Sequence, residues 1–152
     1  MDKHYIPNTK GVIFANKNKF SFSIDSILLS YFSKVKKDKI LIDIGAGTGI
    51  IGFRINFLNN LKTVYLIEIQ KENAKLIEHS IVENKLNNVI LLNKDLKECY
   101  NEFENSSVDY IVSNPPYKKM NTGILNKDEN FLISRYEYAL KLEDILDFSY
   151  KK

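Results

Sequence analysis

The segment Asn114-Pro115-Pro116-Tyr117 carries groups that could hold a primary amine. The amide oxygen of Asn114 and the carbonyl of Pro115 are hydrogen-bond acceptors, and both prolines have a fixed φ and lack an N–H. Two acceptors on the hydrogens of a ring-conjugated amine favour a pyramidal nitrogen, whose lone pair then becomes nucleophilic without a strong general base. The Tyr117 ring offers a flat face on which a flipped-out base can stack, worth roughly 1–3 kcal/mol. Taken alone, however, two prolines after an apolar run more often form a turn that ends a strand.

A glycine-rich segment, Asp43-Ile44-Gly45-Ala46-Gly47-Thr48-Gly49, is the second candidate for a functional element. Glycines after an apolar run permit a tight turn that brings backbone N–H groups close to a ligand at the start of the next helix. The following apolar run ends at Glu68, whose carboxylate could accept both hydroxyls of a ribose. Residues 47–52 formally fit the G-x-G-x-x-G dinucleotide fingerprint, but in that fingerprint the first glycine makes the strand-ending turn, which here is Gly45. The register is therefore G-x-G-x-G preceded by Asp43, with a ligand-free turn as the alternative.

The hydrophobic pattern indicates the elements that must position these groups. Nearly continuous apolar runs predict buried strands at residues 40–44, 63–67, 89–92 and 108–112. Helical periodicity predicts helices at residues 50–58, 70–84, 128–140 and 142–150. Strands that alternate with helices predict an α/β fold with a mostly parallel, doubly wound, Rossmann-like sheet. In such a sheet the glycine loop and the N-P-P-Y segment both lie at the carboxyl ends of strands, where ligands bind.

The N-terminal region, residues 1–38, is predicted to pack on a domain that spans residues 39–152. Two β-prone runs within Gly11 to Phe22, on either side of residues 16–19, predict a hairpin. A helix is predicted over residues 23–31, where serine at position 23 is a favourable N-cap. Its apolar residues recur at helical spacing and are Ile24, Ile27, Leu28 and Tyr31.

The composition excludes several classes of protein. The chain has 152 residues, enough for one domain, and 44% of them are hydrophobic, which excludes a disordered chain. Its net charge of +3 is compatible with a polyanionic partner but is better explained by a lysine-rich surface. One cysteine cannot form an internal disulfide, and two separated histidines without a cysteine cluster indicate no metal site. The sequence shows neither a signal-like segment nor a run long enough to span a bilayer, so we expect a cytoplasmic protein with no membrane partner.

Together the motifs resemble those of class I methyltransferases of the N-P-P-Y group, and within it the bacterial tRNA(valine) adenine-N6 methyltransferase family. The resemblance runs from about Gly11 to the C-terminus through FSFSIDSILLSYF, ILIDIGAGTGIIGFRI, VYLIEIQKENAKLIEHSIVENKL, VDYIVSNPPYKK and ISRYEYALKLEDIL. It implies S-adenosylmethionine as the cofactor and RNA, in the first place tRNA, as the substrate partner.

The resemblance also implies particular site residues. The target amine would be held by Asn114, Pro115, Pro116 and Tyr117. The cofactor contacts would be Asp43, Gly45, Ala46, Gly47, Gly49, Glu68, Ile69, Asp95, Leu96 and Asn114. Asp95 follows the third strand, where such enzymes often hold the adenine amino group with a carboxylate. A turn-forming aspartate after a strand is nearly as good an account of it.

The chain departs from the family's pattern in its length. Family members continue after the LEDIL helix with three further strands, so we expect a C-terminally incomplete domain with strands in the order 3-2-1-4. Its fourth strand would then lie at an exposed edge, through which two copies could associate. Adenine N6 in tRNA is the expected target. A glutamine side chain in a protein (N5), guanine N2 in rRNA, and a non-catalytic fragment that binds S-adenosylmethionine or RNA stay open as alternatives.

Overall fold

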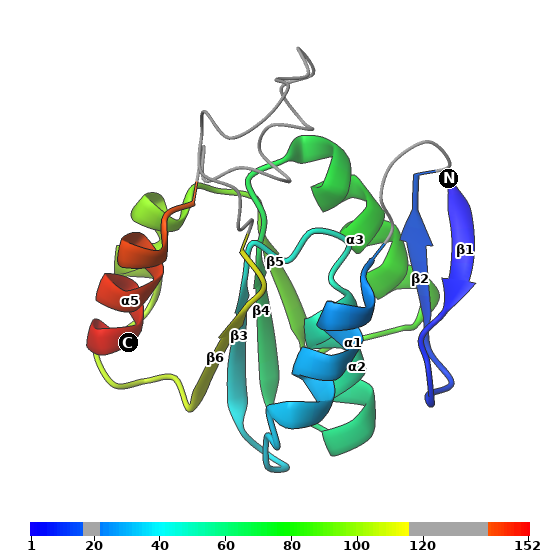
Figure 1. Cartoon of the computed structure of the whole chain (residues 1–152), viewed down its shortest axis with the longest axis horizontal. Helices are drawn as coiled ribbons and strands as arrows, with labels where there is room; N and C mark the ends of the chain where they lie inside the picture. Colours follow the sequence, from blue (N-terminus) through cyan, green and yellow to red (C-terminus); the bar gives the residue numbers. More distant parts are fainter. Residues whose placement is uncertain (17–21, 116–139) are drawn as a thin grey trace.

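A sheet of four parallel strands is the centre of the computed structural model, which describes residues 1–16, 22–115 and 140–152 (Figure 1). The strands are β3 (Ile40–Ile44), β4 (Thr63–Ile67), β5 (Val89–Leu92) and β6 (Tyr110–Ser113). Their spatial order is β5-β4-β3-β6, which confirms the predicted parallel sheet and its order. β6 begins later than predicted. Just before it, the Oδ2 of Asp109 accepts the backbone N–H of Ile40 at 2.9 Å, so a side-chain oxygen takes the place of the backbone carbonyl that would continue the strand.

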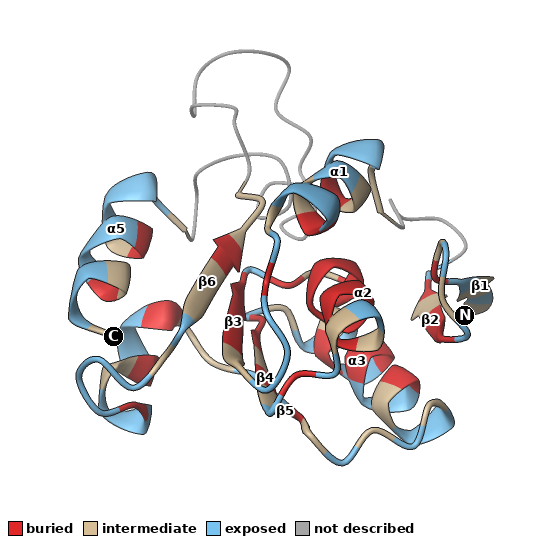
Figure 2. Ribbon diagram, turned by 90° about the horizontal axis from the view of Figure 1, so that it is seen from below, coloured by how far each residue is buried: buried red, intermediate tan, exposed pale blue. Residues whose placement is uncertain are grey.

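Helices cover both faces of the sheet (Figures 1 and 2). One face carries α1 (Ile24–Phe32), α2 (Ile50–Asn59) and α3 (Lys71–Glu83), and the other carries the 3-10 helix η1 (Leu96–Glu102) and α5 (Leu142–Lys151). Alternate strand residues supply two cores: Leu41 packs in the core that includes α2 and α3, and Ile42 in the core that includes η1 and α5. Burial on both faces explains why the strands read as continuous apolar runs.

The predicted helices at residues 50–58, 70–84 and 142–150 are confirmed as α2, α3 and α5, whereas the one at residues 128–140 lies outside the described residues. Among the helices that the structure describes, none combines the length and the apolar character needed to cross a membrane.

An antiparallel hairpin is present at the N-terminus, but its strands differ from the expected ones. β1 (Asp2–Tyr5) pairs with β2 (Val12–Ala15). The partner of β2 therefore precedes it in the sequence, whereas the expected partner follows it. Thr9 closes the turn: its Oγ1 accepts the N–H of Gly11 at 3.0 Å and donates to the carbonyl of Ile6 at 3.0 Å. The second expected strand falls largely on residues 17–21, outside the described residues, and Phe22 is not in a strand.

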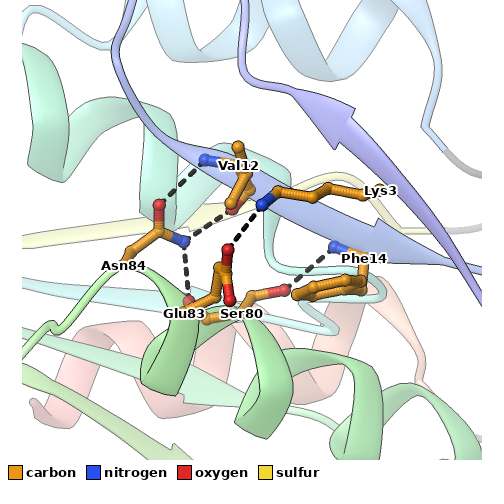
Figure 3. A network of polar contacts seen from close by, with 6 residues as sticks. All are labelled: Lys3, Val12, Phe14, Ser80, Glu83 and Asn84. Carbon is orange, nitrogen blue, oxygen red and sulfur yellow. Dashed lines mark hydrogen bonds and ion pairs between the residues drawn. The ribbon is translucent and has the colours of Figure 1, made fainter.

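Side chains of α3 and of its C-cap close the edge of the hairpin that β2 turns toward this helix (Figure 3). At the end of that helix, Asn84 Oδ1 accepts the N–H of Val12 at 2.8 Å, and its Nδ2 donates to the carbonyl of Val12 at 2.6 Å. One turn earlier, Ser80 Oγ accepts the N–H of Phe14 at 3.0 Å. Lys3 of β1 forms an exposed ion pair with Glu83. These bonds replace the backbone partners that a third strand would provide.

Replacing Asn84 with alanine is expected to lower the free energy of unfolding by about 2–3 kcal/mol, because the N–H and carbonyl of Val12 both lose their partner in a buried position. Urea unfolding followed by circular dichroism measures this change. Lys3→Ala is the matched control on the same hairpin, since an exposed ion pair contributes little. Equal unfolding midpoints for the wild type and Asn84→Ala would show that water satisfies the strand edge equally well.

The helix α1 begins where the sequence predicts. Ser23 is its N-cap, and the Ser23 hydroxyl accepts the N–H of Ser26 at 3.3 Å. The buried face differs from the expected apolar one, because the residues of α1 with the lowest exposure are Ser26 and Ser30. Of the predicted apolar residues, Ile27 packs against the core, while the others are exposed: Ile24, Leu28 and Tyr31.

A buried arginine accounts for part of this polar face. Arg54, which is 3% exposed on α2, donates from Nη1 to Ser30 Oγ at 2.9 Å and from Nε to the carbonyl of Pro7 at 3.2 Å. The guanidinium therefore links three parts of the chain: α1, α2 and the turn of the N-terminal hairpin. A buried cation requires such acceptors, and a serine supplies one where an aliphatic residue could not.

Candidate active site

The predicted site residues lie at one edge of the sheet, because all four strands run in the same direction and end there. The glycine loop follows β3, Glu68 follows β4, Asp95 follows β5 and Asn114 follows β6. β3 and β6 are neighbours, and their register pairs Ile44 with Ser113. Each of these two strands then ends, so the glycine loop and the start of the N-P-P-Y segment are brought side by side.

The glycine loop has a left-handed backbone, with φ of 59° at Gly47 and 81° at Gly49, where α2 begins. A side chain at Gly49 would also collide with the Phe53 ring, since an added Cβ would lie 2.6 Å from it. At Gly47 an added Cβ would meet nothing within 4 Å among the described residues, so in this part of the structure the loop borders open space. The loop is attached to the end of β4, because the N–H groups of Gly45 and Ala46 both donate to the carbonyl of Ile67.

Asp43, the last acidic residue before the loop, is fully buried in the middle of the sheet. Its Oδ2 accepts the N–H of Gly52 at 2.9 Å, and its Oδ1 has no hydrogen-bond partner among the residues that the structure describes. The pKa of Asp43 is raised to about 7, mainly by burial; the N–H of Gly52 acts to lower it, and the nearby Glu68 carboxylate acts to raise it. A buried carboxylate with an unsatisfied oxygen beside a glycine loop is a group suited to a polar or cationic ligand.

Glu68 holds the loop from the end of β4. Its Oε2 accepts the N–H of Gly47 and its Oε1 accepts the N–H of Gln70, both at 2.7 Å. Burial raises the pKa of Glu68 to about 7, and hydrogen bonds from these N–H groups, from Asn73 and from the N–H of Ile69 act in the opposite direction. A carboxylate has about four lone-pair sites, and these four contacts account for them, so a ribose hydroxyl would have to share or displace one. The ribose role of Glu68 stays a prediction.

Asp95 has a structural role at this edge. It is the N-cap of η1: its Oδ1 accepts the N–H of Lys97 at 2.9 Å, and its own N–H donates to Glu98 at 3.3 Å. This geometry agrees with the alternative interpretation of Asp95, a turn-forming aspartate after a strand. A contact between Asp95 and the adenine of the cofactor stays a prediction. Two further predicted cofactor contacts differ in exposure: Leu96 is buried in the core below η1, whereas Ile69 is 39% exposed.

Asn114 and Pro115 are half-buried at the end of β6, while Pro116 and Tyr117 lie outside the described residues. The Asn114 side chain contacts a residue that sequence analysis did not select: its Nδ2 donates to Ser26 Oγ of α1 at 3.1 Å. The only sequence signal for Ser26 is a serine on the face of α1 opposite its apolar residues, which by itself indicates solvent exposure.

The fold and this edge define a methyltransferase of the class I, Rossmann-like type. A family model described as the methyltransferase small domain matches residues 10–138, and the chain belongs to this family.

Three relatives carry the names of tRNA, protein and RNA methyltransferases. A tRNA1(Val) (adenine(37)-N6)-methyltransferase of Parabacteroides distasonis is 26% identical over 99% of this chain and 62% of that protein. A release factor glutamine methyltransferase of Mycoplasma mycoides is 27% identical over 77% of this chain and 43% of that protein. An uncharacterised RNA methyltransferase of Fusobacterium nucleatum is 33% identical over 66% of this chain and 22% of its own length. The chain therefore spans 22% to 62% of the length of these relatives.

Solved structures support the same fold. The crystal structure of M. jannaschii TYW2 in complex with AdoMet has a TM-score of 0.61 at 21% identity, and the match covers 86% of this chain and 54% of that chain. A precorrin-6y C5,15-methyltransferase of Geobacter metallireducens has a TM-score of 0.57 at 15% identity over 66% of this chain and 53% of its own. At these identities the likeness concerns the fold.

S-adenosylmethionine is the cofactor that this family implies, and the described residues fit it. The loop borders open space at Gly47, where an added Cβ would lie more than 4 Å from every atom of the described residues that could obstruct it. The carboxyl groups of Asp43 and Glu68 lie next to that loop, and Asp43 Oδ1 has no hydrogen-bond partner among the described residues. A cationic ligand there would favour the ionised form of both groups. The cofactor carries a positive sulfonium and a ribose with two hydroxyls, which such a donor set can accommodate.

Proposed function

We propose that this protein transfers a methyl group from S-adenosylmethionine to an exocyclic amine, and that the amine is N6 of an adenine in tRNA. The observation that carries the proposal is the pairing of Ser113 with Ile44, which sets Asn114 beside the first glycine of the loop. The cofactor-holding and amine-holding segments are thus neighbours on adjacent strands. The names of the relatives from Parabacteroides distasonis and Haemophilus influenzae support tRNA as the substrate. The proposal implies a cytoplasmic location.

The chain's own residues would act by binding and orientation. Gly45, Ala46, Gly47 and Gly49 would present the loop to the cofactor, Asp43 and Glu68 would supply negative charge, and Ile69, Asp95 and Leu96 would border the adenosine. When bound, S-adenosylmethionine supplies a methyl group on a positively charged sulfur.

The amine would be held by the N-P-P-Y segment. Asn114 Oδ1 and the Pro115 carbonyl would accept its two hydrogens, and Tyr117 would stack on the base. Because both hydrogens are held in this way, the nitrogen lone pair is withdrawn from the ring and is available as the nucleophile. The prolines keep these acceptors in place because their φ is fixed.

A protein glutamine is the second candidate, because the N-P-P-Y segment can hold an amide nitrogen equally well and a release factor glutamine methyltransferase is among the relatives. The two candidate substrates differ in the molecule that presents the nitrogen, which is a tRNA in the first case and a protein in the second. Self-association through the β6 edge, which is an end of the sheet in the described part of the chain, stays a prediction.

Transfer from tritiated S-adenosylmethionine tests the proposal. The purified protein is offered unmodified tRNA and, separately, an unmodified release-factor protein. We expect label on tRNA that digests to N6-methyladenosine. Label on glutamine alone would replace the first candidate with the second. No transfer to either, together with cofactor binding by calorimetry, would overturn the enzymatic proposal in favour of a non-catalytic binding domain.

A further inference from the structure

A serine of α1 contacts the side chain that would hold the amine. Ser26 and Asn114 are separated by 88 positions in the sequence, and Asn114 Nδ2 lies 3.1 Å from Ser26 Oγ. Ser26 is 7% exposed and Asn114 is half-buried, so the contact is partly shielded from water. Inside a protein such a hydrogen bond is stronger than in water, and losing one partner leaves the other unsatisfied.

The Ser26 hydroxyl is itself held in place. Its Oγ lies 3.4 Å from Ser23 Oγ, and the Ser26 N–H donates to that same Ser23 oxygen at 3.3 Å. Ser23 is the N-cap of α1. The position of Ser26 Oγ is therefore held by the first turn of the helix.

This arrangement distinguishes the two ends of the Asn114 amide. A hydroxyl has one proton. In the contact between the two hydroxyls, either oxygen could be the donor. In the direction in which Ser26 donates to Ser23 Oγ, Ser26 Oγ can only accept from Asn114, so the NH2 end of Asn114 faces α1 and its carbonyl end faces away. The reversed amide would direct its two N–H donors toward the amine, where two donors would oppose each other.

We propose that Ser26 is a positioning residue for methyl transfer, whose hydroxyl orients the Asn114 amide with its oxygen toward the target amine. This proposal rests on the function proposed above. Ser26 touches neither the cofactor nor the amine in this scheme, and its effect reaches the reaction through Asn114 alone.

Steady-state kinetics of Ser26→Ala test the role in turnover. We expect kcat to fall by roughly tenfold to a hundredfold, since a misplaced acceptor costs about this much, while KM for S-adenosylmethionine changes less than twofold. Ser26→Thr keeps the hydroxyl and is expected to recover most of kcat. Ser30→Ala is the matched control: it removes a buried hydroxyl from the same helix that contacts Arg54 instead of Asn114, so it lowers the melting temperature without lowering kcat. An unchanged kcat in Ser26→Ala, or an equal loss in Ser30→Ala, would overturn the proposal.

The side-chain amide of Asn114 gives a second readout that does not need activity. In 15N-labelled protein we expect its NH2 protons to exchange slowly with solvent, at least tenfold slower than in Ser26→Ala, and to be unchanged in Ser30→Ala. Identical exchange in the wild type and Ser26→Ala would contradict the contact itself. If the wild type methylates neither tRNA nor protein, the proposed function fails, and the orienting contact is still decided by this measurement.

Discussion

Asn114→Ala is expected to lower kcat for methyl transfer to tRNA by about 10²- to 10³-fold, which is the usual effect of removing one preorganised hydrogen-bonding group from an active site. The side chain is half-buried at the end of β6, beside the glycine loop, and alanine there leaves the Pro115 carbonyl as the sole remaining acceptor in the proposed pair. Single-turnover label transfer measures the change directly. Calorimetry should show cofactor affinity within about threefold of the wild type, because the loop and Glu68 are retained.

Asn59→Ala is the matched control for this prediction. Asn59 is also a half-buried asparagine, but its Nδ2 donates to the carbonyl of Ile55 within α2. We expect it to retain the wild-type kcat. A wild-type rate in Asn114→Ala would show that the amine is held by other groups, and an equal loss in affinity and kcat would assign Asn114 to cofactor binding.

Asp43→Asn is expected to change the pH dependence of stability by about 2–3 kcal/mol between pH 5 and pH 8. The folded-state pKa of Asp43 is raised from 3.8 to about 7, mainly by burial, so the folded state binds more protons than the unfolded state between these values. The contribution of Asp43 to the free energy of unfolding is therefore fully present below pH 4 and is lost as pH rises to about 7. Asparagine does not titrate, so this slope disappears in the variant.

Urea unfolding at pH 5, 6, 7 and 8 measures the difference between the wild type and Asp43→Asn, and the contribution of Glu68 largely cancels because it is present in both. Asp109→Asn is the control. The N–H of Ile40 and the Lys39 ammonium lower the pKa of Asp109, so its contribution changes only as pH falls below about 4. Its unfolding curve should run parallel to the wild type from pH 5 to pH 8. Parallel curves for Asp43→Asn as well would contradict a raised pKa at the buried carboxylate.

The central sheet could be predicted because its strands are buried on both faces. Nearly continuous apolar runs such as Ile40–Ile44 do not alternate between polar and apolar residues, as a strand with one face in solvent would. Because these strands alternate with helices, a parallel sheet is the simplest way to connect them. The hairpin was harder, since the partner of Val12–Ala15 depends on the turn at Thr9 and on α3, neither of which an alternating pattern reveals.

Polar contacts between segments that are distant in the sequence are the part of the candidate site that could not be predicted. The positions of Gly47, Glu68 and Asn114 follow from strand ends, which sequence analysis located. The contact between Ser26 and Asn114 does not, because it joins two elements through a helix face that composition would place in water. Buried serines become comprehensible only once their partners are known.

The closed edge of β2 has a consequence for the behaviour of the protein at high concentration. A two-stranded hairpin on a surface presents backbone groups that can recruit a strand from another molecule, which begins aggregation. The bonds from Asn84 and Ser80 already occupy the N–H groups of Val12 and Phe14, so a neighbouring molecule would first have to detach the hairpin from α3. Two polar side chains on one helix thereby close β2 to strand addition, so that in the described two-stranded sheet such an addition would have to occur at β1.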